Sequence, residues 1–507
     1  MPSADPDDLS AEARDALVRA LFAERARHAA RIAELEGEAA AGKARVAELE
    51  AIVVRLTAQV EELAEKLRRN SSNSNLPPSS DGPGAAARGE RGTKKPPSGR
   101  KRGGQKGHRG AYRELLAADR VDDFVEMHPD FCEGCGLALP RTPGLDPRRY
   151  QVLELLGSRP HITEFQRHEV ECGRCGHRTR AAYDAERIPS SSFGPRLVSV
   201  VAMLTGTYHL SRRRAQQMLR EVFEIEVSLG AISAMEARAS EALAPAALEA
   251  QREVEEADVK HTDATSWLRA GVRKSLWTIA SALATVYKIV DDGCRETIRP
   301  LFGQVRKGIL VSDRATVFDF WSIEHRQVCW AHIIRRWVSF SERSGAAGAV
   351  GRELLDCAAL VFEYWHGLVD GKLTRDELAV WMRPLQDQLE AVLGRAVAAG
   401  VPGVSGSCAD ILARKDALWT FVTHEGVEPT NNHAERELRE FVLWRRRSFG
   451  TQSERGERFA ERVMTVVHTA RKHGKNVLEF LIRCFTAHDR GTTPPPLLGL
   501  AAAYRPP

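Results

Sequence analysis

The sequence of 507 residues lacks a long apolar segment and contains few cysteines and few aromatic residues. Its longest apolar helix candidate, residues 197–204, is far shorter than the roughly 20 residues that span a bilayer, so no membrane protein is expected. The N-terminus is acidic and has no apolar signal segment, so we expect an intracellular protein. Nine cysteines, four of them in two Cys-x-x-Cys pairs, favour one metal site over a disulfide framework.

The chain also has little net charge, because its 73 basic residues nearly balance its 68 acidic ones. Residues 88–113 depart from this balance, with ten Lys or Arg and one acid, Glu90. This Gly- and Pro-rich block cannot bury a core and attracts polyanions, so we predict that it binds DNA phosphates. A soluble linker is the alternative. The predicted DNA-binding residues are Lys94, Lys95, Arg100, Lys101, Arg102, Lys106 and Arg109.

Residues 10–69 carry apolar side chains at alternating steps of three and four, which is typical of a coiled coil. Val at one seam position and Leu at the other favours a parallel dimer. We expect this helix to drive self-association; a long helix packed on its own chain is the alternative. The seam comprises Ile32, Leu35, Ala39, Val46, Leu49, Val53, Leu56, Val60, Leu63 and Leu67, with Gly42 at one position.

Two Cys-x-x-Cys pairs lie in residues 126–185, around strand-like stretches at 151–156 and 161–171. Four thiolates on two such turns form a closed, tetrahedral zinc site, as in a zinc ribbon. Because four protein ligands leave no open position, we predict structural Zn²⁺, with unliganded reduced thiols as the alternative. The four ligands are Cys132, Cys135, Cys172 and Cys175.

The next region, residues 186–250, is predicted to be helical, at 197–204, at 210–219 and from Ser228, which can cap a helix. Two helices joined by a tight turn fit a helix-turn-helix-like DNA-binding region, and an ordinary helical hairpin fits equally well.

The pattern changes from Asp258 onward. Strand-like runs are predicted at 258–263, 275–281, 284–290, 309–313 and 328–330, with a helical stretch at 315–323. Residues 333–425 are almost wholly helical, and a helix follows at 432–443. Alternating strands and helices predict a mixed α/β sheet, here with an all-helical insertion. All nine tryptophans lie between Trp267 and Trp444, so the main core is expected there.

Three acids are candidates for metal-dependent phosphoryl transfer: Asp263 and Asp313 at strand positions, and Glu435 in the first turn of a helix. Such chemistry needs carboxylates from separate elements that converge on two divalent ions. Each acid has an alternative role. Asp313 is also typical of a turn, and Glu435 can form a capping box with Asn432. Asp263 is harder to explain by a structural role, because an acid inside a strand with apolar neighbours needs a compensating partner.

The sequence resembles the IS66-family insertion-sequence transposases, which have a DDE catalytic core. The resemblance spans nearly the whole chain. Its most specific parts are a proline-rich box at 75–81, Cys-Trp-Ala-His at 329–332 and Asn-Asn-x-Ala-Glu-Arg at 431–436. Further matches, in the expected order, are the zipper-like helix, the basic segment 101–110, the four cysteines, and the strands at 261–265 and 311–313.

The resemblance implies a ribonuclease-H-like core whose catalytic residues, Asp263, Asp313 and Glu435, bind two Mg²⁺ or Mn²⁺ ions. It implies a bacterial, cytoplasmic, nucleoid-associated enzyme that cuts double-stranded DNA at inverted-repeat ends and joins them to a target, as a homo-oligomer with small accessory proteins of the same element. An inactive DNA-binding repressor and a ribonuclease-H-like nuclease are the alternatives. We assign Cys329 and His332 a structural role near the site, because the pair alone lacks two metal ligands.

The predicted organisation is therefore multidomain. It comprises a coiled coil at 1–70, a basic DNA-binding linker at 71–125, a zinc ribbon at 126–185, a helix-turn-helix-like region at 186–250, a catalytic core at 251–450 with a helical insertion at about 333–425, and a C-terminal helical tail at 451–507.

Overall fold

The computed structural model describes residues 10–68, 73, 115–141, 149–154, 160–182 and 191–499. The chain divides into two compact units, Met1–Gly89 and Glu90–Pro507. Within the described ranges, no helix combines the length and the apolar character needed to cross a membrane.

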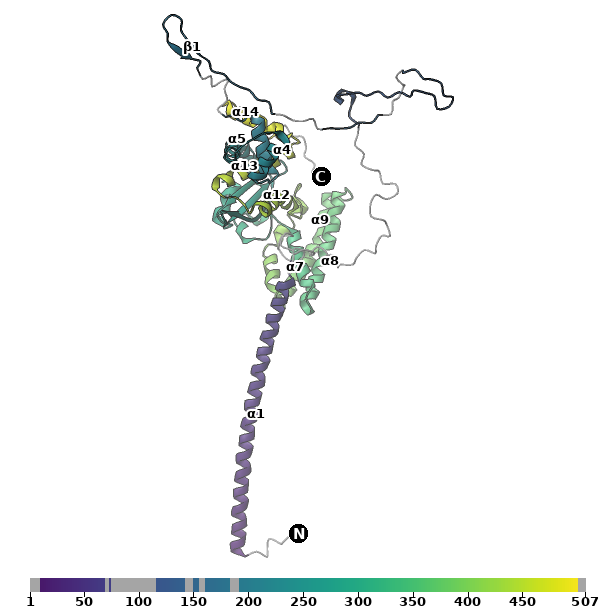
Figure 1. Cartoon of the computed structure of the whole chain (residues 1–507). Coiled ribbons are helices and arrows are strands. Elements are labelled where there is room, and N and C mark those ends of the chain that lie inside the picture. Colours follow the sequence, from purple (N-terminus) through teal and green to yellow (C-terminus); the bar gives the residue numbers. More distant parts are fainter. Residues whose placement is uncertain are drawn as a thin grey trace. The chain divides into compact units, whose positions relative to one another are not determined.

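The first unit contains one unbroken helix, α1 (Ala11–Arg68), of 58 residues (Figure 1, purple). At 1.5 Å per residue it is roughly 87 Å long. The predicted helix is confirmed, and its seam side chains are exposed: Leu35 by 47%, Leu49 by 46%, Leu56 by 51% and Leu63 by 58%. A helix with an uncovered apolar stripe depends on a partner for most of its stability.

Residues 115–182 form short elements: a 3-10 turn at Ala118–Arg120 and an antiparallel hairpin of β1 (Glu169–Glu171) and β2 (Arg178–Arg180). The strands predicted at 151–156 and 161–171 are mostly wrong, because only 169–171 is a strand among the described residues there. Val152 and Ile162 are 76% and 82% exposed, so the alternating apolar residues of these stretches cover no core.

A five-stranded mixed sheet forms the centre of the second unit, in the order β5-β4-β3-β6-β7. The first three strands form an antiparallel meander, and β6 and β7 run parallel to β3. The sheet confirms the predicted mixed α/β core and is consistent with a ribonuclease-H-like fold. The strands are β3 (Val259–Arg269), β4 (Val272–Ala280), β5 (Thr285–Val290), β6 (Ile309–Ser312) and β7 (Arg326–Val328).

Two hydrophobic cores lie on opposite faces of the sheet, as the alternation along β6 shows. Leu310 belongs to one core, and its neighbours Ile309 and Val311 belong to the other. The first core is built with α3 (Pro195–Ala202), α5 (Leu229–Glu256), α12 (Asn432–Ser448), α13 (Glu454–Lys472) and α14 (Val477–Asp489). The second is built with α7 (Trp330–Ser341), α8 (Gly345–Val369), α9 (Arg375–Ala398), α10 (Ser405–Leu412) and α11 (Thr420–Thr423).

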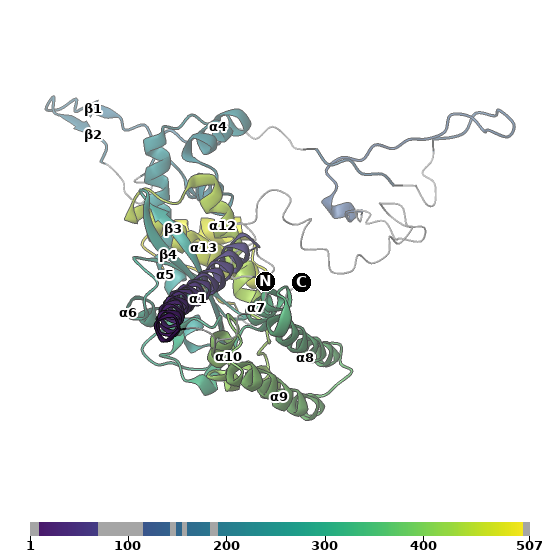
Figure 2. The same ribbon diagram turned by 90° about the horizontal axis from the view of Figure 1, so that it is seen from below.

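The helical insertion extends away from the sheet. Both views show α8 and α9 side by side, at the opposite end of this unit from α4 (Arg212–Phe223) (Figures 1 and 2). The shorter elements are a π-helical turn at Met203–Thr207, α6 at Arg295–Ile298, and 3-10 turns at Arg299–Phe302, Thr316–Phe318, Ile323–His325 and Lys415–Leu418.

The helix predicted at 315–323 is wrong. Two 3-10 turns stand there, because Phe318 and Trp321 are both buried and anchor the segment against Phe302. The strand predicted at 328–330 ends at Val328, and Cys329 instead occupies the N-cap position of α7, without a capping hydrogen bond from its side chain.

The helix pair predicted at 210–219 and from Ser228 exists as α4 and α5, and Ser228 accepts a hydrogen bond from the Ala231 N–H as the predicted cap. However, α5 continues for 28 residues into the core, so the predicted boundary at 250 falls inside this helix.

Helix α13 closes the edge of the sheet at β5. Side chains at four-residue spacing, Glu461, Thr465 and Thr469, accept the backbone N–H groups of Ile289, Tyr287 and Thr285. These bonds satisfy strand donors that an open edge would leave unpaired. The segment predicted as a C-terminal tail is therefore part of the core.

Replacing Thr469 with Val tests this edge. The Thr469 hydroxyl accepts from the Thr285 N–H and donates to its carbonyl, so the isosteric Val leaves both groups buried and unpaired. We expect a loss of about 2–4 kcal/mol in unfolding free energy. Urea unfolding followed by tryptophan fluorescence measures this loss, since all nine tryptophans lie between Trp267 and Trp444, within the second unit. Thr486→Val is the control, because Thr486 bonds only within its own helix. Equal losses in both variants would contradict the account.

Candidate active site

The register of two parallel strands sets the two predicted catalytic aspartates side by side. His261 of β3 pairs with Val311 of β6; Asp263 lies two residues later on β3, and Asp313 lies two residues after Val311, directly after the end of β6. β6 ends at Ser312, so Asp313 lies at the carboxyl end of this strand, beside the middle of β3, which continues to Arg269. Each accepts a local backbone N–H, Asp263 from Ala264 at 2.8 Å and Asp313 from Ala315 at 3.0 Å.

The pKa of Asp263 is raised, as expected for a buried carboxylate close to other carboxylates. This pKa is raised to about 7: burial is the largest cause, the neighbouring Asp313 and Glu435 carboxylates act in the same direction, and the hydrogen bond from the Ala264 N–H opposes them. The three predicted residues therefore lie within electrostatic reach of one another, although 172 positions in the sequence separate Asp263 from Glu435.

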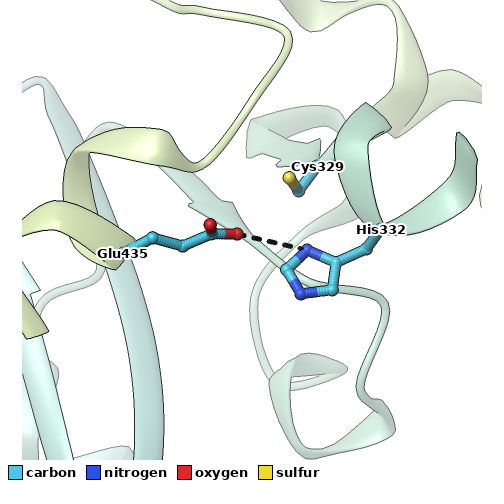
Figure 3. Close-up of side chains that lie close together, drawn as sticks. All are labelled: Cys329, His332 and Glu435. Atoms are coloured by element: carbon cyan, nitrogen blue, oxygen red, sulfur yellow. Dashed lines mark ion pairs between the residues drawn. The ribbon is translucent and has the colours of Figure 1, made fainter. Parts of the chain in front are cut away.

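Glu435 lies in the first turn of α12 and faces the start of α7 (Figure 3). Its Oε1 is 3.8 Å from His332 Nδ1, and its Oε2 is 3.7 Å from an Arg335 guanidinium nitrogen. Both distances are too long for hydrogen bonds. In the part of the chain that the structure describes, Cys329, His332 and Glu435 are the group whose possible metal-ligand atoms all lie within 4.8 Å of one another.

Asn431 joins the elements that carry these groups, and sequence reasoning missed it. Its side-chain amide donates to the Thr262 carbonyl at 2.7 Å, and its Oδ1 lies 3.3 Å from His261 Nδ1. Its backbone N–H donates to Cys329 Sγ at 3.1 Å. The residue is 1% exposed. Asn431 therefore fixes the N-terminus of α12 against both β3 and the residue that precedes α7.

The alternative role considered for Glu435, a capping box with Asn432, is not formed. The residue at the cap position is Asn431, and its side chain makes no capping bond because it is committed to β3. Asn432 is exposed in the first turn. The Glu435 carboxylate is therefore left to face the site. The signal in the sequence is the doublet Asn431-Asn432. The capping position was expected at Asn432, whereas Asn431 occupies it.

A buried ionic network holds the other side of α12. His468 of α13 contacts Glu437 Oε2 at 2.5 Å and Glu440 Oε2 at 3.1 Å, and Lys472 Nζ lies 3.2 Å from Glu437 Oε1. Burial alone would raise the pKa of Glu437, but the hydrogen bonds with His433 and His468 outweigh it and hold that pKa far below its usual range. The network thus fixes the rotation of α12, and with it the direction of Glu435.

Cys329 and His332 lie where a structural role was predicted, near Asp313, with Glu435 as an added third neighbour. Burial raises the pKa of the Cys329 thiol to about 11 and lowers the pKa of His332. The loop acids Glu425 and Glu428 precede α12 and are outside this group of close ligand atoms.

The two predicted zinc-binding pairs adopt matching turns. In one, Cys132 N–H donates to the Leu137 carbonyl and Gly136 closes the turn with positive φ; in the other, Cys172 pairs with His177 and Gly176 does the same. Hydrogen bonds from backbone N–H groups lower the pKa of Cys132 and Cys172. Among the described residues the two pairs do not meet, and all four thiols are free, so the zinc site remains a prediction.

The predicted DNA-binding residues Lys94, Lys95, Arg100, Lys101, Arg102, Lys106 and Arg109 lie outside the described residues.

Replacing Asn431 with Ala should loosen the junction of β3, α7 and α12. The Thr262 carbonyl and His261 Nδ1 would lose buried partners, at about 2–4 kcal/mol of unfolding free energy in total. Asn432→Ala is the matched control, because the adjacent Asn432 side chain is exposed. Urea unfolding monitored by tryptophan fluorescence compares the two variants. If they are equally stable, Asn431 does not have this role.

Comparison with known proteins adds to this geometry. Residues 3–114 match a family of unknown function (DUF6444). A search of curated proteins finds no match. Residues 190–458, more than half of the chain, match the sequence model of the transposase IS66 family. They include the whole sheet, the helical insertion, α12 and all three predicted catalytic residues. The chain therefore belongs to the IS66 family of transposases.

Proposed function

We propose that the protein is a DDE transposase that binds the terminal inverted repeats of an insertion sequence, cuts the DNA there and joins the ends to a target. The observation that carries the proposal is that Asp263 lies within electrostatic reach of Asp313 and Glu435: burial first, and then these two carboxylates, raise the pKa of Asp263 to about 7. A structural role alone gives no reason to gather like charges at one place on the sheet.

The residues fit divalent metal ions. Carboxylate oxygens are the ligands that Mg²⁺ and Mn²⁺ prefer, and a cation would relieve the repulsion within the cluster. In the described part of the chain, the buried Oε1 of Glu435 has no hydrogen-bond partner. In a two-ion site the ions lie about 3.5–4 Å apart, so ligands at its two ends need not touch one another. Asp263, Asp313 and Glu435 would hold these ions, which supply Lewis-acid activation of a water or 3′-hydroxyl.

The protein's own groups keep the carboxylates in place. The Ala264 and Ala315 N–H groups orient Asp263 and Asp313. Behind Asp313, the buried Arg326 guanidinium donates to the Asp313 carbonyl at 3.2 Å. Arg335 lies beside Glu435 and offers positive charge where a DNA phosphate would approach. On the outer side of α12, Arg436 and Arg439 are exposed and available for further phosphate contacts.

The remaining segments are proposed to hold and pair the DNA ends. In this proposal α1 pairs with a second copy of itself, the basic linker at 71–125 contacts the DNA backbone, and the two cysteine pairs bind one structural zinc ion. The α4–α5 pair presents the exposed Arg213 and Arg214 to DNA. Small proteins of the same element act as accessory factors.

Two other functions remain distinguishable by experiment. An inactive repressor would bind the ends without cutting them, and a ribonuclease-H-like nuclease would cut without joining. A donor-excision and strand-transfer assay with cognate ends separates all three. The complete set of three clustered acids favours the transposase over the repressor.

Glu435→Gln is the sharpest test of the catalytic site. The Glu435 carboxylate makes no capping bond, so Gln should preserve the fold while removing a charged ligand for a hard cation. We expect normal thermal stability and DNA binding, and a loss of Mg²⁺- or Mn²⁺-dependent cleavage of at least about a thousandfold, since several kcal/mol of charge stabilisation is lost. Asp263→Asn and Asp313→Asn should behave alike. Glu428→Gln, in the loop before α12, should stay active. An active Glu435→Gln beside a dead Glu428→Gln would refute the assignment.

Charge on the α1 seam should abolish self-association. We predict that Leu56→Glu with Leu63→Glu gives a monomer with an intact core, because the exposed seam would no longer bury apolar surface. The control is Ala47→Glu with Ala51→Glu, which places the same charge on positions off the seam. Light scattering with size-exclusion chromatography measures the mass. A monomeric wild-type protein, with and without DNA, would rule out pairing through α1.

A further inference from the structure

Three potential ligands of different chemistry meet between α7 and α12. Cys329 precedes α7 and His332 follows one helical turn later, so the Cys-x-x-His spacing puts both on one face. Glu435 approaches from α12; its carboxylate faces the His332 ring, and the Cys329 side chain lies beside them (Figure 3). Their ligand atoms all lie within 4.8 Å of one another.

The spacing is close to that of a metal centre. Zn–S and Zn–N bonds of 2.0–2.3 Å in a tetrahedron put ligand atoms roughly 3.3–3.6 Å apart. The 3.8 Å between His332 Nδ1 and Glu435 Oε1 is nearly this separation. Small rotations of the three side chains would bring their ligand atoms to the separation expected around a metal ion.

The atoms that face each other lack other partners. Both His332 Nδ1 and Glu435 Oε1 are buried, and within the described residues neither has a hydrogen-bond partner. Buried polar atoms in folded proteins nearly always have one. Cys329 is also fully buried, and its sulfur already accepts the Asn431 N–H, a contact that suits a thiolate.

The donor set selects a class of ion. Thiolate and imidazole are ligands for zinc and similar transition metals, whereas Mg²⁺ prefers oxygen alone. The Asp263–Asp313 side of Glu435 offers only oxygen ligands, and the Cys329–His332 side offers sulfur and nitrogen. One carboxylate therefore stands between two sites of different preference.

We propose that Cys329, His332 and Glu435 form a second metal site, selective for zinc-class ions, and that an ion bound there withdraws Glu435 from the magnesium site. On binding, the Cys329 thiol releases its proton to solvent as the sulfur–metal bond forms, and no electron transfer is involved. Three protein ligands leave the fourth position to water. The competition for Glu435 rests on the function proposed above, whereas the metal site itself does not.

Cobalt(II) is the probe for the site, because a thiolate ligand gives a sulfur-to-cobalt charge-transfer band. We expect full-length wild-type protein to bind one more Co²⁺ per chain than Cys329→Ser does, with a band that this variant lacks. Cys357→Ser is the control, because Cys357 is another fully buried cysteine, on α8. It should bind like wild type. The cysteine pairs at 132–135 and 172–175 are present in every variant and cancel in the comparison. Equal stoichiometry and equal bands in wild type and Cys329→Ser would overturn the site.

Electron paramagnetic resonance of Mn²⁺ tests the shared carboxylate without relying on DNA cleavage. Zinc is added at one equivalent per chain beyond the structural zinc proposed for the two cysteine pairs. It should release at least half of the bound Mn²⁺ from wild type and Cys357→Ser, and less than a tenth from Cys329→Ser. Retention of Mn²⁺ by zinc-loaded wild type would refute the sharing of Glu435. If wild type binds no Mn²⁺, the sharing and the proposed function both fail, while the cobalt result still decides the site.

Discussion

The buried amide of Asn431 is the contact on which the geometry of the site depends. It connects three elements that are far apart in the sequence: β3, through the Thr262 carbonyl and His261; the start of α7, through Cys329; and α12, where Asn431 is the N-cap residue. A buried amide confined in this way has one arrangement that satisfies its donors and acceptor. Because Asp263 directly follows Thr262 and Glu435 lies four residues after Asn431, their separation follows from that arrangement.

Two further constraints act on the same helix. On the face away from the site, Glu437, His468 and Lys472 form a buried ionic network that stops α12 from turning about its axis. Across the sheet, the parallel pairing of β3 with β6 fixes Asp313 relative to Asp263. The result is a cluster of acids that burial and mutual repulsion make unfavourable in the absence of cations. Perturbed carboxylates of this kind are typical of functional sites, because packing alone would not retain them.

Local patterns in the sequence predicted much of the fold. The three-four repeat predicted α1, β-rich runs predicted the strands of the sheet, and Ser228 marked the start of α5, because each signal depends on neighbouring residues. Segments whose conformation depends on distant partners were predicted less well. Phe318 and Trp321 anchor turns where a helix was expected, and exposed alternation at 151–156 forms no strand. The three acids were identified from motifs, but Asn431 was not, since its partner Thr262 lies 169 residues away.

The proposed function requires that Asp263, Asp313 and Glu435 bind divalent ions at one place. Iron(II) substituted for magnesium, with ascorbate and peroxide, cleaves the backbone beside its own ligands, and mass spectrometry locates the cuts. If the three residues share one ion site, cuts are expected next to all three, each suppressed by excess Mg²⁺. Cuts at one of the three alone, or cuts elsewhere that Mg²⁺ does not suppress, would contradict it.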